Sequence, residues 1–138
     1  MGETVWMPGP LRVEIKLGGA QTGGAFCLLV DHPPPGWALP AHTHAREAET
    51  ILVEAGRFEM VVDGERTELG PGDLVHVPAG MRHEGRALHE HGEGRRTLIF
   101  SPAGMEAFFR AAGAATPEEQ RDLATLARIA GEHGWRFG

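Results

Sequence analysis

The sequence predicts an all-β domain, of the barrel or sandwich type, followed by two helices. Glycine and proline account for 20 and 10 of the 138 residues and are spread along the whole chain. Dispersed turn formers of this kind are typical of many short strands and not of a disordered chain. Turn signals recur about every ten residues up to Phe100, which is the spacing of a sandwich or barrel. Beyond Phe100 the apolar residues change to helical spacing.

The first strand is predicted over residues 11–17, where apolar and charged side chains alternate as in a half-buried strand. Turns are predicted at Gly18-Gly19, at Gly23-Gly24 and at the Pro-Pro-Pro-Gly run 33–36. Asp63-Gly64 is a hairpin signal. The further strands are predicted over residues 25–31, 49–54, 57–62, 66–69, 74–77 and 95–100.

Two amphipathic helices are predicted after the last strand. Ser101 is a candidate N-cap with Pro102 in the first helical position, and Gly113 ends this helix. Residues 116–119 form a capping-box signature for the second helix, which Gly131 ends. We expect both helices to pack outside the barrel and cover its apolar surface. Residues 1–138 are therefore predicted to form one domain, with a barrel over about 11–100 and a helical extension over about 101–131.

Composition excludes several classes of partner. The chain has 13 basic and 19 acidic residues and no basic stripe, so nucleic-acid binding is not expected. The longest strongly apolar stretch, residues 25–30, is too short to cross a bilayer, and no secretory signal is visible. Cys27 is the single cysteine, so no intramolecular disulfide can form. A soluble cytoplasmic protein is the expectation.

Two segments carry an unusual concentration of glycine, proline and metal-ligand residue types. They contain Gly36, His42-x-His44, Glu49 and Gly56 in the first segment, and Gly72, Pro78-x-Gly80 and His83 in the second. These spacings resemble the two motifs of the cupin superfamily, and the resemblance covers about residues 25–100. It implies a double-stranded β-helix (jelly-roll-type) barrel. It also implies one divalent transition metal bound by His42, His44, Glu49 and His83.

Simple strand geometry agrees with this ligand set. Residues two apart share one face of a strand, so His42 and His44 can both point inward. Glu49 follows at an odd spacing, so the chain must bend or begin a new strand before it. Glu47 competes as the carboxylate ligand, although the distance to Gly56 favours Glu49. Three imidazoles and one carboxylate suit Fe, Mn, Ni, Co, Cu or Zn, and in an octahedral site they leave two positions open.

Other features are given plainer interpretations. Ala87 stands where the second cupin motif usually has asparagine, which in that family is a structural residue and not a metal ligand. His89-x-His91 has ligand spacing but lies in a polar loop, and His76 either lines the barrel or points outward. Gly56, Gly72 and Gly80 are expected in turns that need a positive φ angle. The candidate pocket walls are Phe26, Ile51, Val53, Phe58, Met60 and Phe100.

The resemblance is to single-domain cupins of the quercetin dioxygenase-like group. It implies a metal-dependent dioxygenase that acts on a small oxygenated aromatic or flavonol-like substrate. Glu49 would then hold the metal or act as a catalytic general base. A metal-dependent isomerase or lyase of a sugar or keto acid, and a non-enzymatic metal- or ligand-binding protein, remain alternatives. A homodimer is also implied, with residues 11–17 as a candidate exposed sheet edge.

Overall fold

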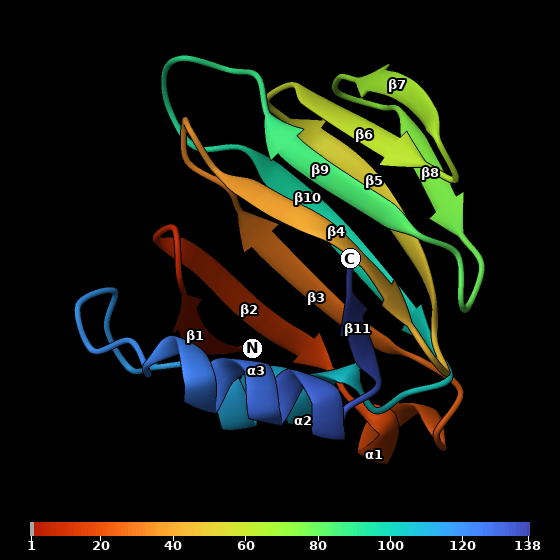
Figure 1. The fold of residues 1–138 in the computed structure, drawn as a ribbon, viewed down its shortest axis with the longest axis vertical. Helices are drawn as coiled ribbons and strands as arrows, with labels where there is room; N and C mark the ends of the chain where they lie inside the picture. The colour runs from red at the N-terminus through yellow and green to blue at the C-terminus, as the bar shows by residue number, and fades with distance from the viewer. Residues whose placement is uncertain (1) are drawn as a thin grey trace.

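The computed structural model describes residues 2–138, which form two antiparallel β-sheets and three helices. The two sheets face one another as in a jelly roll and do not close into a continuous barrel (Figure 1). The strands are β1 Glu3–Met7, β2 Leu11–Leu17, β3 Cys27–His32, β4 Ala38–His44, β5 Ala48–Ala55, β6 Phe58–Val62, β7 Glu65–Leu69, β8 Leu74–Val77, β9 His83–Ala87, β10 Arg95–Ser101 and β11 Trp135–Phe137. The helices are α1 Gly19–Thr22, α2 Met105–Ala112 and α3 Leu123–Glu132.

The strand order explains how distant motifs meet. The larger sheet runs β1-β2-β3-β10-β5-β8, and the smaller one runs β11-β4-β9-β6-β7. The two strands of the first motif, β4 and β5, lie in different sheets, and β9 of the second motif pairs with β4. The glycines of the motifs fall in turns as predicted, because Gly56, Gly72 and Gly80 all have positive φ angles near 80–90°.

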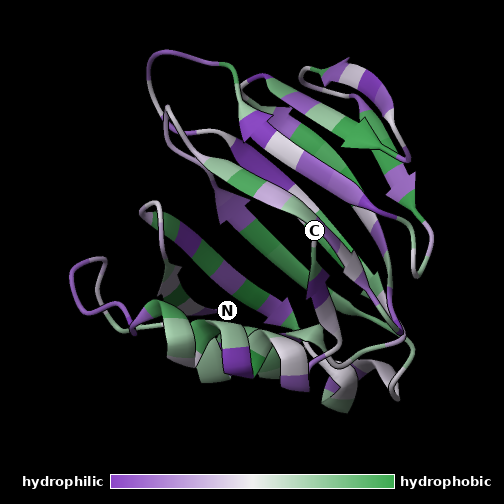
Figure 2. Cartoon of the chain, viewed as in Figure 1, coloured by the Kyte–Doolittle hydropathy of each residue, from purple (hydrophilic) through white to green (hydrophobic). Residues whose placement is uncertain are grey.

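The space between the sheets holds the hydrophobic core. Along β2 the side chains alternate between buried apolar and partly exposed charged residues, as predicted from the sequence (Figure 2). The same alternation places Leu98 and Phe100 of β10 and Ile51 and Val53 of β5 inside. Cys27 is fully buried with a free thiol, and burial raises the pKa of that thiol to about 12. The cysteine therefore serves as a small core residue.

The two C-terminal helices are confirmed, but their predicted boundaries were partly wrong. Ser101 is not a helix cap: it ends β10, and α2 begins at Met105 after Gly104. Residues 116–119 do not cap the second helix either, because Asp122 caps α3 by accepting a hydrogen bond from the Thr125 amide at 2.8 Å. Gly113 ends α2 as predicted, whereas α3 continues past Gly131 to Glu132.

Several elements were not predicted. β1, α1 and β11 are additional, and β1 pairs with the whole of β2. Residues 11–17 are therefore not an exposed sheet edge, because they lie between β1 and β3. After His83 the chain continues as strand β9 through Ala87 and makes no turn. No helix in residues 2–138 is both long and apolar enough to span a membrane.

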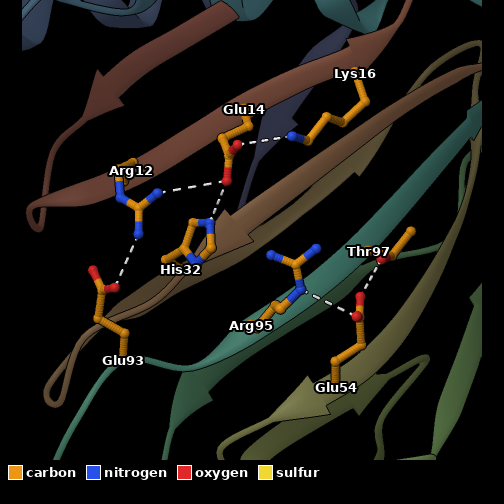
Figure 3. Close-up of polar contacts among 8 residues, drawn as sticks. All are labelled: Arg12, Glu14, Lys16, His32, Glu54, Glu93, Arg95 and Thr97. Atoms are coloured by element: carbon orange, nitrogen blue, oxygen red, sulfur yellow. Dashed lines mark hydrogen bonds and ion pairs between the residues drawn. The ribbon is translucent and has the colours of Figure 1, made fainter. Parts of the chain in front are cut away.

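A polar network covers the outer face of the larger sheet around Glu14 (Figure 3). The Glu14 carboxylate lies 2.9 Å from Lys16 Nζ and 2.6 Å from His32 Nε2. Hydrogen bonds from Lys16 and His32 lower the pKa of Glu14 to about 2. Because the unfolded chain protonates this group at a higher pH, its contribution to stability is present above the ordinary pKa and is lost as the pH falls toward 2.

Glu14→Gln is therefore expected to lower the free energy of unfolding by roughly 1 kcal/mol at neutral pH, since solvent screens a surface network. The difference from wild type should shrink as the pH falls from 4.5 toward 2. Urea unfolding at a series of pH values measures it. Glu65→Gln is a matched control, because Glu65 makes no ion pair with any residue of the described chain. A pH-independent difference for Glu14→Gln would contradict the prediction.

Candidate metal centre

Three histidines meet inside the molecule, between the two sheets. His42 and His44 lie on β4 and both point inward, while His83 begins β9 and pairs directly with His42. Their side chains are nearly inaccessible, with 2–3% of each residue exposed. One ring nitrogen from each histidine lies within 4.8 Å of those of the other two. The predicted convergence of these three imidazoles is thus present in the structure.

Backbone carbonyls fix the orientation of two of the rings. His42 Nδ1 lies 2.8 Å from the Pro40 carbonyl oxygen, and His83 Nδ1 lies 3.0 Å from that of Met81. A carbonyl oxygen only accepts, so Nδ1 carries the proton in each ring and Nε2 keeps a free lone pair. His83 Nε2 and His44 Nδ1 are fully enclosed and have no hydrogen-bond partner. Three buried imidazoles that each bring a ring nitrogen within 4.8 Å of the other two, one of them the unpartnered His83 ring, are suited to a divalent metal ion.

Glu49 lies beside two of the imidazoles. It is the second residue of β5, so the change of sheet between His44 and Ala48 resolves the odd spacing noted in the sequence. Glu49 Oε1 is 3.5 Å from His44 Nε2 and 3.3 Å from His83 Nε2. Glu47 makes no such contact, and its Oε1 is enclosed without a partner. Within the described chain the mutually close group comprises the three histidines alone, so Glu49 as a fourth ligand stays a prediction.

The ionisable groups of the centre perturb one another. Burial, reinforced by the charge of His83, lowers the pKa of His42 to about 4. Burial alone would raise the pKa of Glu49, but the neighbouring His44 and His83 outweigh it and hold this pKa well below the usual range. Burial likewise opposes charging of His83, yet Glu49 raises its pKa overall. The centre therefore combines an ionised carboxylate with a neutral His42 at neutral pH.

Aromatic side chains enclose the imidazoles. The Trp135 ring of β11 stacks on His42 with centroids 4.7 Å apart, and it meets His44 edge-on at 4.5 Å. Phe100 of β10 packs edge-on against His44 at 5.6 Å. The C-terminal strand thus completes the wall of the site, because β11 pairs with β4 along the register Trp135↔His44 and Phe137↔His42.

A cavity of about 380 Å³ extends from the imidazoles toward the helices and the β1–β2 turn. Its lining is mostly apolar and includes Ile51, Met60 and Phe100 of the predicted pocket wall, but not Phe26, Val53 or Phe58. Helix α3 contributes Leu123, Leu126, Ala127 and Ala130. The helical extension therefore forms part of the cavity and is more than a cover for apolar surface. A cavity of this size accommodates a small organic ligand.

The remaining histidines do not join the site. His76 is exposed on β8 and lies 2.9 Å from the Thr50 hydroxyl. His89 is tied to the Pro33 carbonyl at 2.9 Å, and His91 is exposed in the same loop. The position of His89 and His91 in a loop agrees with the sequence analysis, and of the two positions considered there for His76 the structure has the outward one.

The cavity also has lining residues that the sequence did not predict, among them Asp31, Arg96 and Trp135. The burial of Arg96 could have been predicted, because it is two residues before Leu98 and four before Phe100 and so lies on the same buried face of β10. No local signal marks Trp135, whose position depends on pairing between β11 and β4.

Comparison with known proteins supports the architecture and the chemistry of the centre. The sequence model of the family described as "Cupin domain" matches residues 29–100, just over half of the chain. Quercetin 2,3-dioxygenase of Bacillus subtilis is 34% identical over 92 residues, which are 67% of this chain and 27% of that protein. Acireductone dioxygenase of Rhodopseudomonas palustris is 50% identical over 48 residues, covering 33% of this chain and 29% of that protein. The chain thus spans less than a third of the length of these curated relatives.

Solved structures give the same fold. KdgF from Halomonas superposes with a TM-score of 0.65 at 23% identity and covers 78% of this chain and 90% of that one. An RmlC-like cupin from Shewanella frigidimarina superposes with a TM-score of 0.64 at 22% identity, with coverage of 78% and 89%. Two facing antiparallel sheets, a buried triad of histidines and a matching family model lead to one conclusion: the chain belongs to the cupin family.

Proposed function

We propose that this cupin is a metal-dependent dioxygenase of a small oxygenated aromatic substrate, with His42, His44, His83 and Glu49 as the metal ligands. The observation that carries the proposal is the buried histidine triad, whose ring nitrogens lie within 4.8 Å of one another, beside a largely apolar cavity. The quercetin, acireductone and gentisate dioxygenases among its relatives support an oxygenase over other cupin activities.

When bound, a divalent metal would supply a Lewis acid that polarises an oxygen atom of the substrate. The protein's own part is to hold the three imidazoles in place through the Pro40 and Met81 carbonyls and the Trp135 ring. Glu49 is the cavity carboxylate in contact with the imidazoles, and we assign it as fourth ligand or as acceptor of a proton from a substrate hydroxyl. The apolar walls exclude water and pack against an aromatic ring.

Oxygen consumption tests this function. Protein loaded separately with Fe, Mn, Ni, Co and Cu is offered flavonols, catechols, hydroxybenzoates and enediols, and dissolved oxygen is followed. We expect uptake with at least one pair of metal and substrate, and its loss when the metal is removed with a chelator. Substrate turnover without oxygen would identify a lyase or isomerase instead. A ligand that binds and is recovered unchanged would identify a binding protein.

The cytoplasmic location and the homodimer expected from the sequence stay predictions.

A further inference from the structure

A buried ion pair lies in the wall of the same cavity, away from the histidines. Asp31 on β3 and Arg96 on β10 are register partners, and they are only 1% and 5% exposed. Arg96 donates from Nε to Asp31 Oδ1 at 2.9 Å and from Nη2 to Oδ2 at 2.6 Å. The Trp37 and Phe58 rings pack against the guanidinium, with Cζ 4.6 and 5.0 Å from their centroids. The guanidinium is therefore held in one orientation.

Asp31 uses only one edge of that guanidinium. Five N–H donors are arranged in a rigid plane, and the Nε/Nη2 edge is the one that Asp31 occupies. Nη1 has no hydrogen-bond partner among residues 2–138. It is also absent from the buried side-chain atoms that lack a partner, so part of its surface is accessible. Arg96 lines the cavity, so the Nη1/Nη2 edge is the part of the guanidinium that Asp31 leaves for a ligand there.

The strand geometry places this edge and the metal centre at opposite ends of one space. Arg96, Leu98 and Phe100 are successive inward residues of β10, and all three line the cavity. Phe100 pairs with Glu49 and packs on His44, so the centre lies near that end of β10. Arg96 is four residues, or roughly 13 Å, further along the strand. Burial opposes charging of Arg96, but Asp31 outweighs it and raises the pKa of Arg96, with a smaller contribution from the charge of Glu49.

We propose that Arg96 binds a carboxylate of the substrate, so that the cavity selects aromatic carboxylates over neutral aromatic compounds of the same shape. This rests on the proposed function in one respect, which is that the cavity serves as the substrate site. A planar fork of two N–H donors matches a carboxylate in geometry and charge. Apolar residues such as Ile51, Met60 and Leu98 surround the path between the two ends, which suits an aromatic ring.

Calorimetric titration with 3-hydroxybenzoate and 3-hydroxybenzamide tests the assignment, because the two probes differ only in the charge of one planar group. Full-length protein is titrated both metal-loaded and after chelation. We expect wild type to bind the carboxylate at least about tenfold more tightly than the amide in both states, since a charged hydrogen-bonded pair forms only with the carboxylate. Binding needs no oxygen, so a failure of the dioxygenase function leaves this readout intact.

The variants decide which residue gives the preference. Arg96→Met alone leaves Asp31 unpaired, so Asp31→Val/Arg96→Met is the main variant, and its folding is checked by thermal unfolding. Its preference should fall below about twofold, whereas Arg95→Met, which changes an outward arginine on the same strand, should keep the wild-type ratio. Equal binding of both probes to wild type would overturn the proposal. So would a preference that survives in the double variant, or one that disappears on chelation and thus belongs to the metal.

Discussion

Replacing His42 or His83 with alanine is expected to weaken metal binding roughly hundredfold or more, which would empty the site in purified protein. Each substitution removes one of three imidazoles from a buried centre. Glu49→Gln should weaken binding less, because the histidine triad remains. Metal analysis of protein purified without a histidine tag measures the effect, followed by equilibrium dialysis against the preferred ion.

His76→Ala is the matched control for these variants. His76 is also a strand histidine, but it is exposed on β8 and bonded to Thr50, so its loss should leave the metal content unchanged. Oxygen uptake should fall in parallel with metal content in the His42 and His83 variants. Full metal occupancy in His42→Ala, or an equal loss in His76→Ala, would show that the triad is not the metal site.

The parts of the site that depend on spacing within one short segment could be predicted from the sequence. Period-two alternation was enough to place His42 and His44 on one face of a strand, and both are buried on β4. The odd spacing to Glu49 correctly required a break in the chain, which the structure provides by moving from one sheet to the other. The position of His83 beside the other two histidines could be predicted only from the resemblance to cupins, because neither segment alone indicates that β4 pairs with β9.

The elements that the sequence failed to predict depend on long-range pairing. β11 is a three-residue strand at the C-terminus, and it is extended because it adds to the edge of β4. β1 is similarly set by its register with β2. The helix starts were misplaced because possible caps at Ser101 and Thr116 precede the real starts of α2 and α3. Ser101 instead pairs with Ala48 at the end of β10. Local propensity is a weak guide when tertiary pairing decides.

Arg96 stands next to Arg95 in the chain and was assigned no role from the sequence. Strand parity separates the two residues: Arg95 points outward to Glu54, whereas Arg96 points into the cavity and pairs with Asp31 (Figure 3 shows the outward Arg95, Glu54 and Thr97). A charged residue at a core-facing position is therefore a signal in its own right. It requires a partner on a neighbouring strand, and that partner cannot be identified without the register.

Arg96→Met is expected to lower the free energy of unfolding by about 3–5 kcal/mol, because it leaves the Asp31 carboxylate buried without its partner. Asp31→Val/Arg96→Met should recover most of this loss, since replacing a whole buried ion pair with apolar residues is often close to neutral. Urea unfolding of the chelated protein measures both, because bound metal would add its own stabilisation.

Arg95→Met is the control for the effect of Arg96→Met on the free energy of unfolding. Arg95 also forms an ion pair, with Nε 3.1 Å from Glu54, but 43% of its side chain is exposed. Arg95→Met should therefore cost less than about 1 kcal/mol. If Arg96→Met proved no more destabilising than Arg95→Met, the Asp31–Arg96 pair would not be desolvated as the structure places it. If the double variant were as unstable as the single one, the loss would come from packing against Trp37 and Phe58 and not from an unpaired charge. A large single and a small double effect would show that the loss comes from the unpaired charge of Asp31.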